Sequence, residues 1–104
     1  MKQFDLFANP LPSARRATPY IVLLQSDLTR TGRDRVVAPL IVRGRTPPIE
    51  WRPMPRVIVD GRELNILIPG LTVVSVRDLH EPVGSIAAER DAIVAALDFL
   101  FLGI

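Results

Sequence analysis

The stretch from Arg56 to Ile68 reads RVIVDGRELNILI and carries the clearest structural signal in the chain. Two runs of β-favouring residues flank Asp60-Gly61, a dipeptide that readily takes the two positive φ angles of a type I′ turn. The stretch therefore predicts an antiparallel hairpin with strands at Arg56–Val59 and Arg62–Ile68.

Apolar runs before and after this hairpin predict more strands. Tyr20–Leu24 is continuously β-rich, which is typical of a central strand. Arg35–Val42 contains Pro39, which cannot donate to a ladder and is expected at an edge or a bulge. Leu71–Val76 follows a turn at Pro69-Gly70 and adds another strand.

The N-terminal segment alternates in polarity. Phe4, Leu6 and Ala8 recur with a period of two, which predicts a half-buried strand with Phe7 as an apolar exception on its outer face. This strand is expected to end at Asn9-Pro10. Because five or six strands follow one another without a helix between them, we predict a small antiparallel β-barrel.

The stretch from Gly84 to Ile104, GSIAAERDAIVAALDFLFLGI, has the pattern of a helix, unlike the β-rich runs before it. Gly84-Ser85 offers an N-cap, and no Gly or Pro follows until Gly103. Apolar residues then recur at helical spacing, which predicts a C-terminal amphipathic helix of about five turns. These residues are Ile86, Ile93, Leu97, Leu100 and Ile104, with Val94 and Phe101 beside them. The predicted fold class is mostly β with a C-terminal α-helix.

Composition limits the class of protein. The chain has 104 residues, of which 48% are hydrophobic, so we expect one packed domain over residues 1–104. Cys is absent, which excludes disulfides and fits a reducing cytoplasm. The apolar runs are too short for a signal peptide or a membrane span. A net charge of +2 is too small to argue for direct DNA binding by the chain alone.

A catalytic or metal site is hard to assemble from this sequence. His80 is the single histidine, and its position just outside the predicted last strand favours a solvated loop residue over a catalytic one. Asp60 and Glu63 flank the hairpin turn, where carboxylates usually aid solubility. No His/Asp/Glu cluster has ligand spacing, and no phosphate-binding glycine pattern occurs. We therefore predict no enzyme activity, no metal and no cofactor.

The apolar chain end is the remaining candidate site. Bulky apolar side chains crowd the last six residues, where a helix normally frays, so they need burial. One face can pack on the core, and Leu97, Leu100 and Ile93 suit either that packing or a dimer interface. Leu102 lies on another face and indicates a partner or a second copy.

Three segments, in this order, resemble the CcdB family of bacterial toxins. They are Gln25-Ser26-Asp27-Leu28, Arg35-Val36-Val37-Ala38-Pro39-Leu40 and the terminal Phe101-x-Gly103-Ile104. The similarity runs from Gln3 to Ile104. The resemblance implies a homodimer that enters the DNA gyrase A subunit dimer and traps the covalent enzyme–DNA cleavage complex. The gyrase-binding residues that it implies are Leu28, Thr29, Asp98, Phe101, Leu102, Gly103 and Ile104.

One position departs from the family pattern. The family chain end reads Phe-Trp-Gly-Ile, with the Trp stacked on a gyrase arginine, whereas this chain has Leu102. Leucine has no π face, so a cation–π contribution of about 0.5–2 kcal/mol is lost. Burial of leucine still yields roughly 1.5–3 kcal/mol, so the resemblance implies a weaker site and not a lost one.

The resemblance also implies a CcdA-like antitoxin whose disordered acidic segment wraps the toxin. Arginines in two proline-rich loops, residues 10–19 and 43–55, suit such a ligand. They are Arg15, Arg16, Arg43 and Arg45.

Two alternatives stay open at this point. MazF-type endoribonuclease toxins have the same barrel-plus-helix architecture, and a ribonuclease would use arginines together with His80. A detoxified relative would keep the fold and antitoxin binding, with toxicity ended by Leu102.

Overall fold

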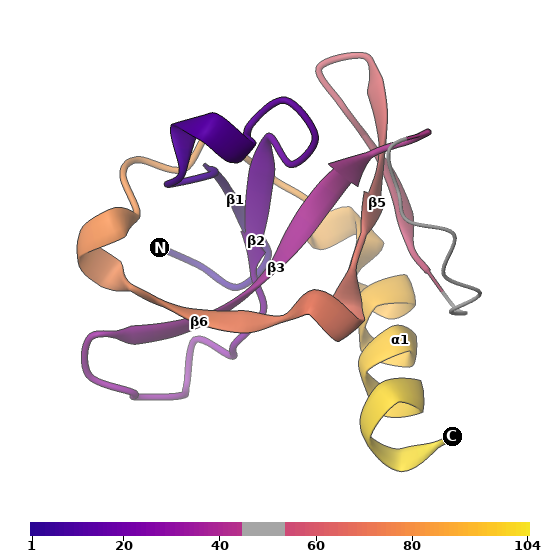
Figure 1. Ribbon diagram of the computed structural model, residues 1–104. Coiled ribbons are helices and arrows are strands. Elements are labelled where there is room, and N and C mark those ends of the chain that lie inside the picture. Colours follow the sequence, from indigo (N-terminus) through magenta and orange to yellow (C-terminus); the bar gives the residue numbers. More distant parts are fainter. Residues whose placement is uncertain (45–53) are drawn as a thin grey trace.

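One curled antiparallel sheet, a half-barrel, forms the body of the molecule (Figure 1). The computed structural model describes residues 1–44 and 54–104. Within these residues the strand order is β4-β5-β3-β2-β1-β7, and β6 pairs with β3. The strands are β1 (Asp5–Ala8), β2 (Tyr20–Leu23), β3 (Asp34–Val42), β4 (Arg56–Val59), β5 (Arg62–Ile66), β6 (Thr72–Ser75) and β7 (Gly84–Ser85). The predicted fold class, mostly β and antiparallel with a C-terminal helix, is confirmed.

Strands β4 and β5 form the predicted hairpin. Val59 pairs with Arg62, so Asp60 and Gly61 alone make the turn, with φ angles of 50° and 76°. Both angles are positive, as a type I′ turn requires. The Tyr20 hydroxyl donates a 2.9 Å hydrogen bond to Asp60 Oδ2, which ties the turn to the central strands.

Strand β3 is central and changes partner along its length. Residues Leu40–Val42 pair with β5, and Asp34–Val37 pair with β6. Pro39 lies between these two stretches, and its carbonyl accepts a 2.9 Å hydrogen bond from the Leu67 amide. Since the N and O of a strand residue point to the same side, the missing N–H faces the gap between β5 and β6. The expectation of an edge or a bulge is corrected: Pro39 lies inside the sheet, where it interrupts no ladder.

Both faces of the sheet are apolar. One face, with Leu6, Val22 and Ala38, belongs to the main core beneath the helix. Alternate residues of the same strands build a second cluster on the other face, made of Phe7, Ile21, Leu23, Val37 and Leu79. The prediction that Phe7 lies on an outer, solvent-facing side of the sheet is wrong. Phe7 is only 1% exposed, because the second face of the sheet is also covered. The chain after β6 covers this face with Leu79, a contact that local alternation cannot reveal.

The C-terminal helix α1 (Arg90–Leu102) is shorter than predicted. Gly84 and Ser85 do not cap it, because they pair with Leu6 and Asp5 of β1. A 3₁₀ turn, Ala87–Glu89, then leads into the helix. Three further 3₁₀ turns lie at Pro12–Ala14, Ile68–Gly70 and Val76–Asp78. In Figure 1 the last turns of α1, in yellow, extend beyond the strands and end at the C-terminus.

Candidate functional site

Helix α1 separates its apolar residues onto two faces. Ile93 and Ala96 are buried, and Leu97 and Leu100 pack against the same core. These residues hold the helix on the sheet, so the structure assigns Leu97 and Leu100 to core packing. An inward-facing stripe of this kind is the usual reason for amphipathic spacing.

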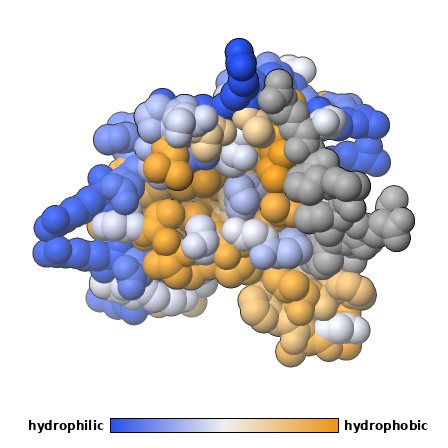
Figure 2. Space-filling view, in the orientation of Figure 1, coloured by the Kyte–Doolittle hydropathy of each residue, from blue (hydrophilic) through white to orange (hydrophobic). Residues whose placement is uncertain are grey.

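The other apolar residues of the helix end face outward. We call Phe99, Phe101, Leu102 and Ile104 the terminal patch. Phe101 and Leu102 are each 66% exposed, and Ile104 is 82% exposed. Figure 2 shows this apolar surface at the lower right, over the projecting end of α1. Contiguous exposed apolar surface on a small protein usually marks an interaction site.

The structure brings together the predicted site residues of the helix end. Asp98 is exposed on α1 beside the terminal patch. Gly103 ends the helix in a left-handed conformation, with φ of 71°. A glycine reaches this conformation without the strain that a Cβ would cause. Five of the seven predicted gyrase-binding residues thus lie at one place.

Leu28 and Thr29 lie elsewhere, in the turn after β2. The Leu28 amide donates to Ser26 Oγ and the Thr29 amide to the Ser26 carbonyl, at 3.1 Å and 3.0 Å. Leu28 is 91% exposed. In Figure 1 the β2–β3 connection is at the lower left and the C-terminus at the lower right. A single chain therefore does not bring these two residues to the terminal patch.

Gln3 links this turn to the helix, which the sequence did not suggest. Its amide donates to Asp27 Oδ1 at 2.7 Å, and its Nε2 donates to the Leu24 carbonyl at 2.9 Å. Its Oε1 accepts a hydrogen bond from Arg90 at 3.2 Å. The partners are 21, 24 and 87 residues away, so no local signal could have identified Gln3.

Three of the four predicted antitoxin-binding arginines gather at one end of the sheet. Arg15 donates from Nε to the Asn9 carbonyl at 2.7 Å, and Arg16 beside it is exposed. The Val42 amide donates to the Ala17 carbonyl, which places the end of β3, and with it Arg43, next to the same loop. Arg45 lies outside the described residues.

Arg43 forms an ion pair with Glu63 on β5. The hydrogen bond from Arg43, then the positive charge of Arg43, lowers the pKa of Glu63. The same hydrogen bond, then the negative charge of Glu63, raises the pKa of Arg43. Both side chains are exposed, so this pair is accessible to a competing carboxylate. Arg16 is exposed and has no ion-pair partner among the described residues.

The ribonuclease alternative finds little geometric support. His80 is exposed after the 3₁₀ turn Val76–Asp78 and, within residues 1–44 and 54–104, takes part in no hydrogen bond or ion pair. A general base needs a positioned partner, which the described part of the chain does not supply here.

Comparison with known families decides the class of the protein. The family model described as CcdB protein matches residues 3–103, nearly the whole chain. The chain belongs to the CcdB family. CcdB proteins are toxins of toxin–antitoxin systems and act without enzymatic activity of their own, so the predicted absence of catalysis follows from family membership. None of the curated proteins matches the chain significantly.

The half-barrel with one C-terminal helix agrees with this CcdB assignment. Among the described residues no helix combines the length and the apolar character that crossing a membrane requires. This CcdB chain thus has two candidate binding surfaces, the terminal patch and the arginines at the end of the sheet.

Proposed function

We propose that this CcdB protein poisons DNA gyrase: it binds the gyrase A subunit and traps the covalent gyrase–DNA cleavage complex. The observation that carries the proposal is the terminal patch, whose exposed side chains occupy the positions that the resemblance assigns to gyrase binding. The protein itself breaks no bond. It acts by stabilising one state of its target, as any ligand with higher affinity for that state does.

The geometry suits insertion of a protruding helix end into a partner. Phe101, Leu102 and Ile104 offer apolar surface that association would bury, and Gly103 leaves the backbone accessible. Leu102 supplies burial without a π face, so we expect weaker poisoning than a tryptophan at this position would give.

Supercoiling of plasmid DNA by the host's own gyrase with ATP tests this function. Addition of the protein, followed by denaturation of gyrase, should release linear plasmid. Leu102→Gln should reduce linearisation, because it removes apolar surface from the terminal patch. Ile58→Gln is the matched control, since Ile58 is an exposed apolar residue on β4, remote from the helix end in sequence. No linear DNA with the unaltered protein would refute gyrase poisoning.

We further propose that the active species is a homodimer acting in the cytoplasm, with no direct DNA binding of its own. A dimer would present two terminal patches and two Leu28 turns to the symmetric A subunits. Sedimentation equilibrium should give twice the 11.6 kDa of one chain. A monomer at micromolar concentration would contradict this part of the proposal.

We also propose a cognate acidic antitoxin that binds through Arg15, Arg16, Arg43 and Arg45. The gathering of the three described arginines at one end of the sheet supports it. Electrostatic attraction of this kind accelerates association and falls with ionic strength. Arg16→Glu should slow the binding of the antitoxin encoded beside this protein and leave gyrase poisoning unchanged.

A detoxified relative is the second candidate, and Leu102 is the observation that favours it. Expression of the protein alone in a host with a matched gyrase separates the two functions. Growth arrest supports the poison, whereas unimpaired growth together with antitoxin binding supports the detoxified form.

A further inference from the structure

The Leu28 turn, residues 25–29 after β2, is closed by its own side chains. Gln25 Oε1 accepts a 2.7 Å hydrogen bond from the Val36 amide of β3, and Ser26 Oγ accepts from the Leu28 amide at 3.1 Å. Hydrogen bonds of this kind hold a turn in one shape. The exposed Leu28 side chain therefore has a defined place on the turn.

Gln3 connects the Leu28 turn to the start of the helix. Its backbone amide donates to Asp27 Oδ1 at 2.7 Å, which ties the turn to the segment before β1. Its side chain continues the connection, since Nε2 donates to the Leu24 carbonyl at 2.9 Å and Oε1 accepts from Arg90 at 3.2 Å. Arg90 is the first residue of α1. We call this chain of contacts, Asp27–Gln3–Arg90, the turn–helix link.

Phe4, the neighbour of Gln3, has an uncommon backbone conformation. Its φ is 69°, in the left-handed region that bulky residues rarely adopt. Burial holds Phe4 there, and so do two hydrogen bonds: the Phe4 amide donates to the Leu23 carbonyl at 2.7 Å, and the Ile86 amide donates to the Phe4 carbonyl at 2.9 Å. Such strain persists only where the surroundings impose it, and it is frequent at binding sites. The strained Phe4 sets the direction of the chain at Gln3, beside the Leu28 turn.

Arg90 contacts both Gln3 and Phe4. Its guanidinium carbon lies 5.8 Å from the centre of the Phe4 ring, within the range of a cation–π contact, while Nη1 donates to Gln3 Oε1. Arg90 takes part in no ion pair within residues 1–44 and 54–104, so no carboxylate there competes with Gln3 for it. Removal of Arg90 would leave the Gln3 side chain oriented by its bond to Leu24 alone. Arg90 is therefore placed to fix the orientation of Gln3.

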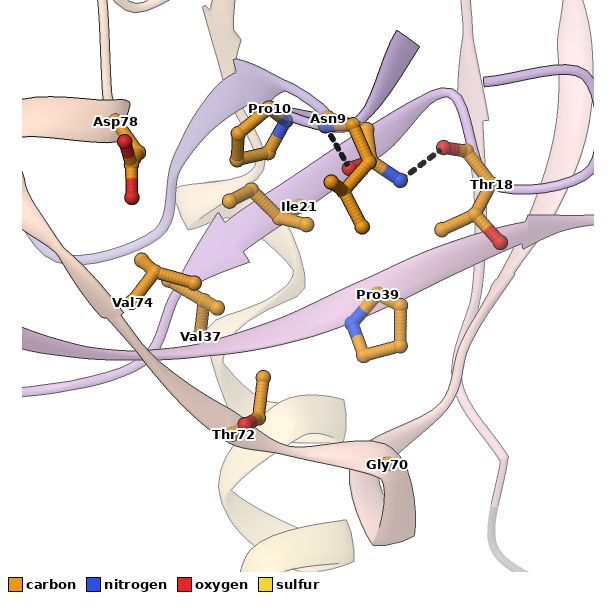
Figure 3. Close-up of a pocket in the computed structure, with 11 residues that line it drawn as sticks. Asn9, Pro10, Thr18, Ile21, Val37, Pro39, Gly70, Thr72, Val74 and Asp78 are labelled. Carbon is orange, nitrogen blue, oxygen red and sulfur yellow. Dashed lines mark hydrogen bonds between the residues drawn. The ribbon is translucent and has the colours of Figure 1, made fainter. Parts of the chain in front are cut away.

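The turn–helix link lies on the side of the sheet that carries the helix. Phe4 and Leu24 belong to the main core. The other face has a pocket of about 370 Å³, with Ile21, Val37 and Val74 in its wall (Figure 3). None of the three link residues lines this pocket. A change at the pocket is therefore expected to leave the link intact.

We propose that Arg90 is a positioning residue for gyrase binding: through Gln3 it fixes the Leu28 turn relative to α1, the helix that carries the terminal patch. The inference rests on the proposed binding of gyrase through the Leu28 turn and the terminal patch, and it adds how the first of these surfaces is held in place. Arg90 itself needs no contact with gyrase. Two surfaces that are already fixed bind a partner more tightly, because less conformational freedom is lost on association.

NMR tests the link without gyrase. Arg90→Met removes the charge and the donors but keeps an unbranched side chain beside the Phe4 ring. We expect the Gln3 amide to exchange with solvent about threefold to tenfold faster, and the amide resonances of Leu28 and Thr29 to shift. Unchanged exchange at Gln3 together with unchanged resonances of the turn would overturn the inference.

Arg62→Met is the matched control. Arg62 is an exposed arginine of β5 whose side chain forms no hydrogen bond or ion pair with the described residues. It follows the turn at Asp60, which is bonded to Tyr20 at the start of β2, whereas the Leu28 turn follows the end of that strand. Thr72→Val, at the pocket on the other face, is a second control. Changes in either control as large as in Arg90→Met would show a general effect on the sheet and overturn the inference.

Plasmid linearisation tests the consequence for gyrase. Arg90→Met should raise the concentration that gives half-maximal linear plasmid by about threefold to tenfold, and Arg90→Lys, which keeps a donor for Gln3, by less than about twofold. In a Leu28→Ser background the effect of Arg90→Met should shrink to less than about twofold, because the link acts through Leu28. An effect of equal size in both backgrounds would mean that Arg90 acts by direct contact or through stability, and would overturn the inference.

Failure of the poison gives a different result from failure of the link. No linear plasmid with the unaltered protein refutes gyrase poisoning, whatever the amide resonances of the turn show. Linear plasmid from the unaltered protein, with an equal yield from Arg90→Met at every concentration, refutes the positioning role of Arg90 alone.

Discussion

The Gly103 amide donates a 3.0 Å hydrogen bond to the Phe99 carbonyl, while Gly103 itself has a positive φ of 71°. This bond closes the last turn of α1 immediately before Ile104. An added Cβ would meet no atom within 4 Å, so a side chain at this position is penalised by the backbone conformation alone.

Gly103→Ala should therefore destabilise the last helical turn by about 1 kcal/mol and reduce gyrase poisoning. The global unfolding transition should change little, because the core-facing residues of α1 precede this turn. Hydrogen exchange of the Gly103 amide and plasmid linearisation measure the two effects. Gly103→Asn is the control, since asparagine tolerates the left-handed region, and poisoning that falls equally in both variants would contradict this account.

Leu102→Trp should strengthen gyrase poisoning. Leu102 is largely exposed, so the larger ring has room, and a ring over a gyrase arginine adds about 0.5–2 kcal/mol. The concentration of protein that gives half-maximal linear plasmid should fall by roughly twofold to thirtyfold. Leu102→Phe should give a smaller gain, and no change with either ring would argue against a cation–π contact at this site.

The variants Ile93→Ala and Phe101→Ala should distinguish a residue of the core from a residue of the binding surface. Ile93 is fully buried, and its truncation should lower the free energy of unfolding by about 2–5 kcal/mol. Phe101 is mostly exposed, so its truncation should lower the free energy of unfolding by no more than about 0.5 kcal/mol. The same truncation should reduce gyrase poisoning. Urea unfolding at one fixed protein concentration is required, because dimerisation contributes to stability. Comparable destabilisation by the two variants would show that Phe101 belongs to the core.

Features with a local cause were predictable from the sequence. The turn at Asp60 and Gly61 follows from two adjacent residues that tolerate positive φ, and the structure has it there. The end of α1 at Gly103 likewise follows from the conformational freedom of glycine. The exposure of Leu102 could also be predicted, because helical spacing places Leu102 on a different face from Leu97 and Leu100.

Features with a distant cause were not predictable. Phe7 is buried because Leu79 folds over it, and Gly84 forms a strand because the edge of β1 lies open beside it. The helix starts later than predicted for the same reason. The backbone groups of Gly84 and Ser85 pair with β1 and are therefore not available to a helix. The separation of Leu28 from the terminal patch also depends on topology, which spacing along the chain does not encode.

The ion pair of Arg43 and Glu63 predicts a specific pH dependence. The hydrogen bond and charge of Arg43 lower the pKa of Glu63 below its unfolded value of about 4.3, so the pair stabilises the fold above that pH. The contribution is lost as pH falls through the lower, folded pKa. The difference in unfolding free energy between the unaltered protein and Glu63→Gln should accordingly be constant from pH 7 to about pH 5 and shrink below about pH 4.

Two controls test whether Arg43 causes this pH dependence. Introduction of Glu63→Gln into an Arg43→Gln background should remove most of the pH dependence. Addition of 1 M salt should reduce the pH dependence, because both side chains are exposed. A difference that stays constant down to pH 3 would contradict this account, because Glu63 would then stabilise the fold without its charge.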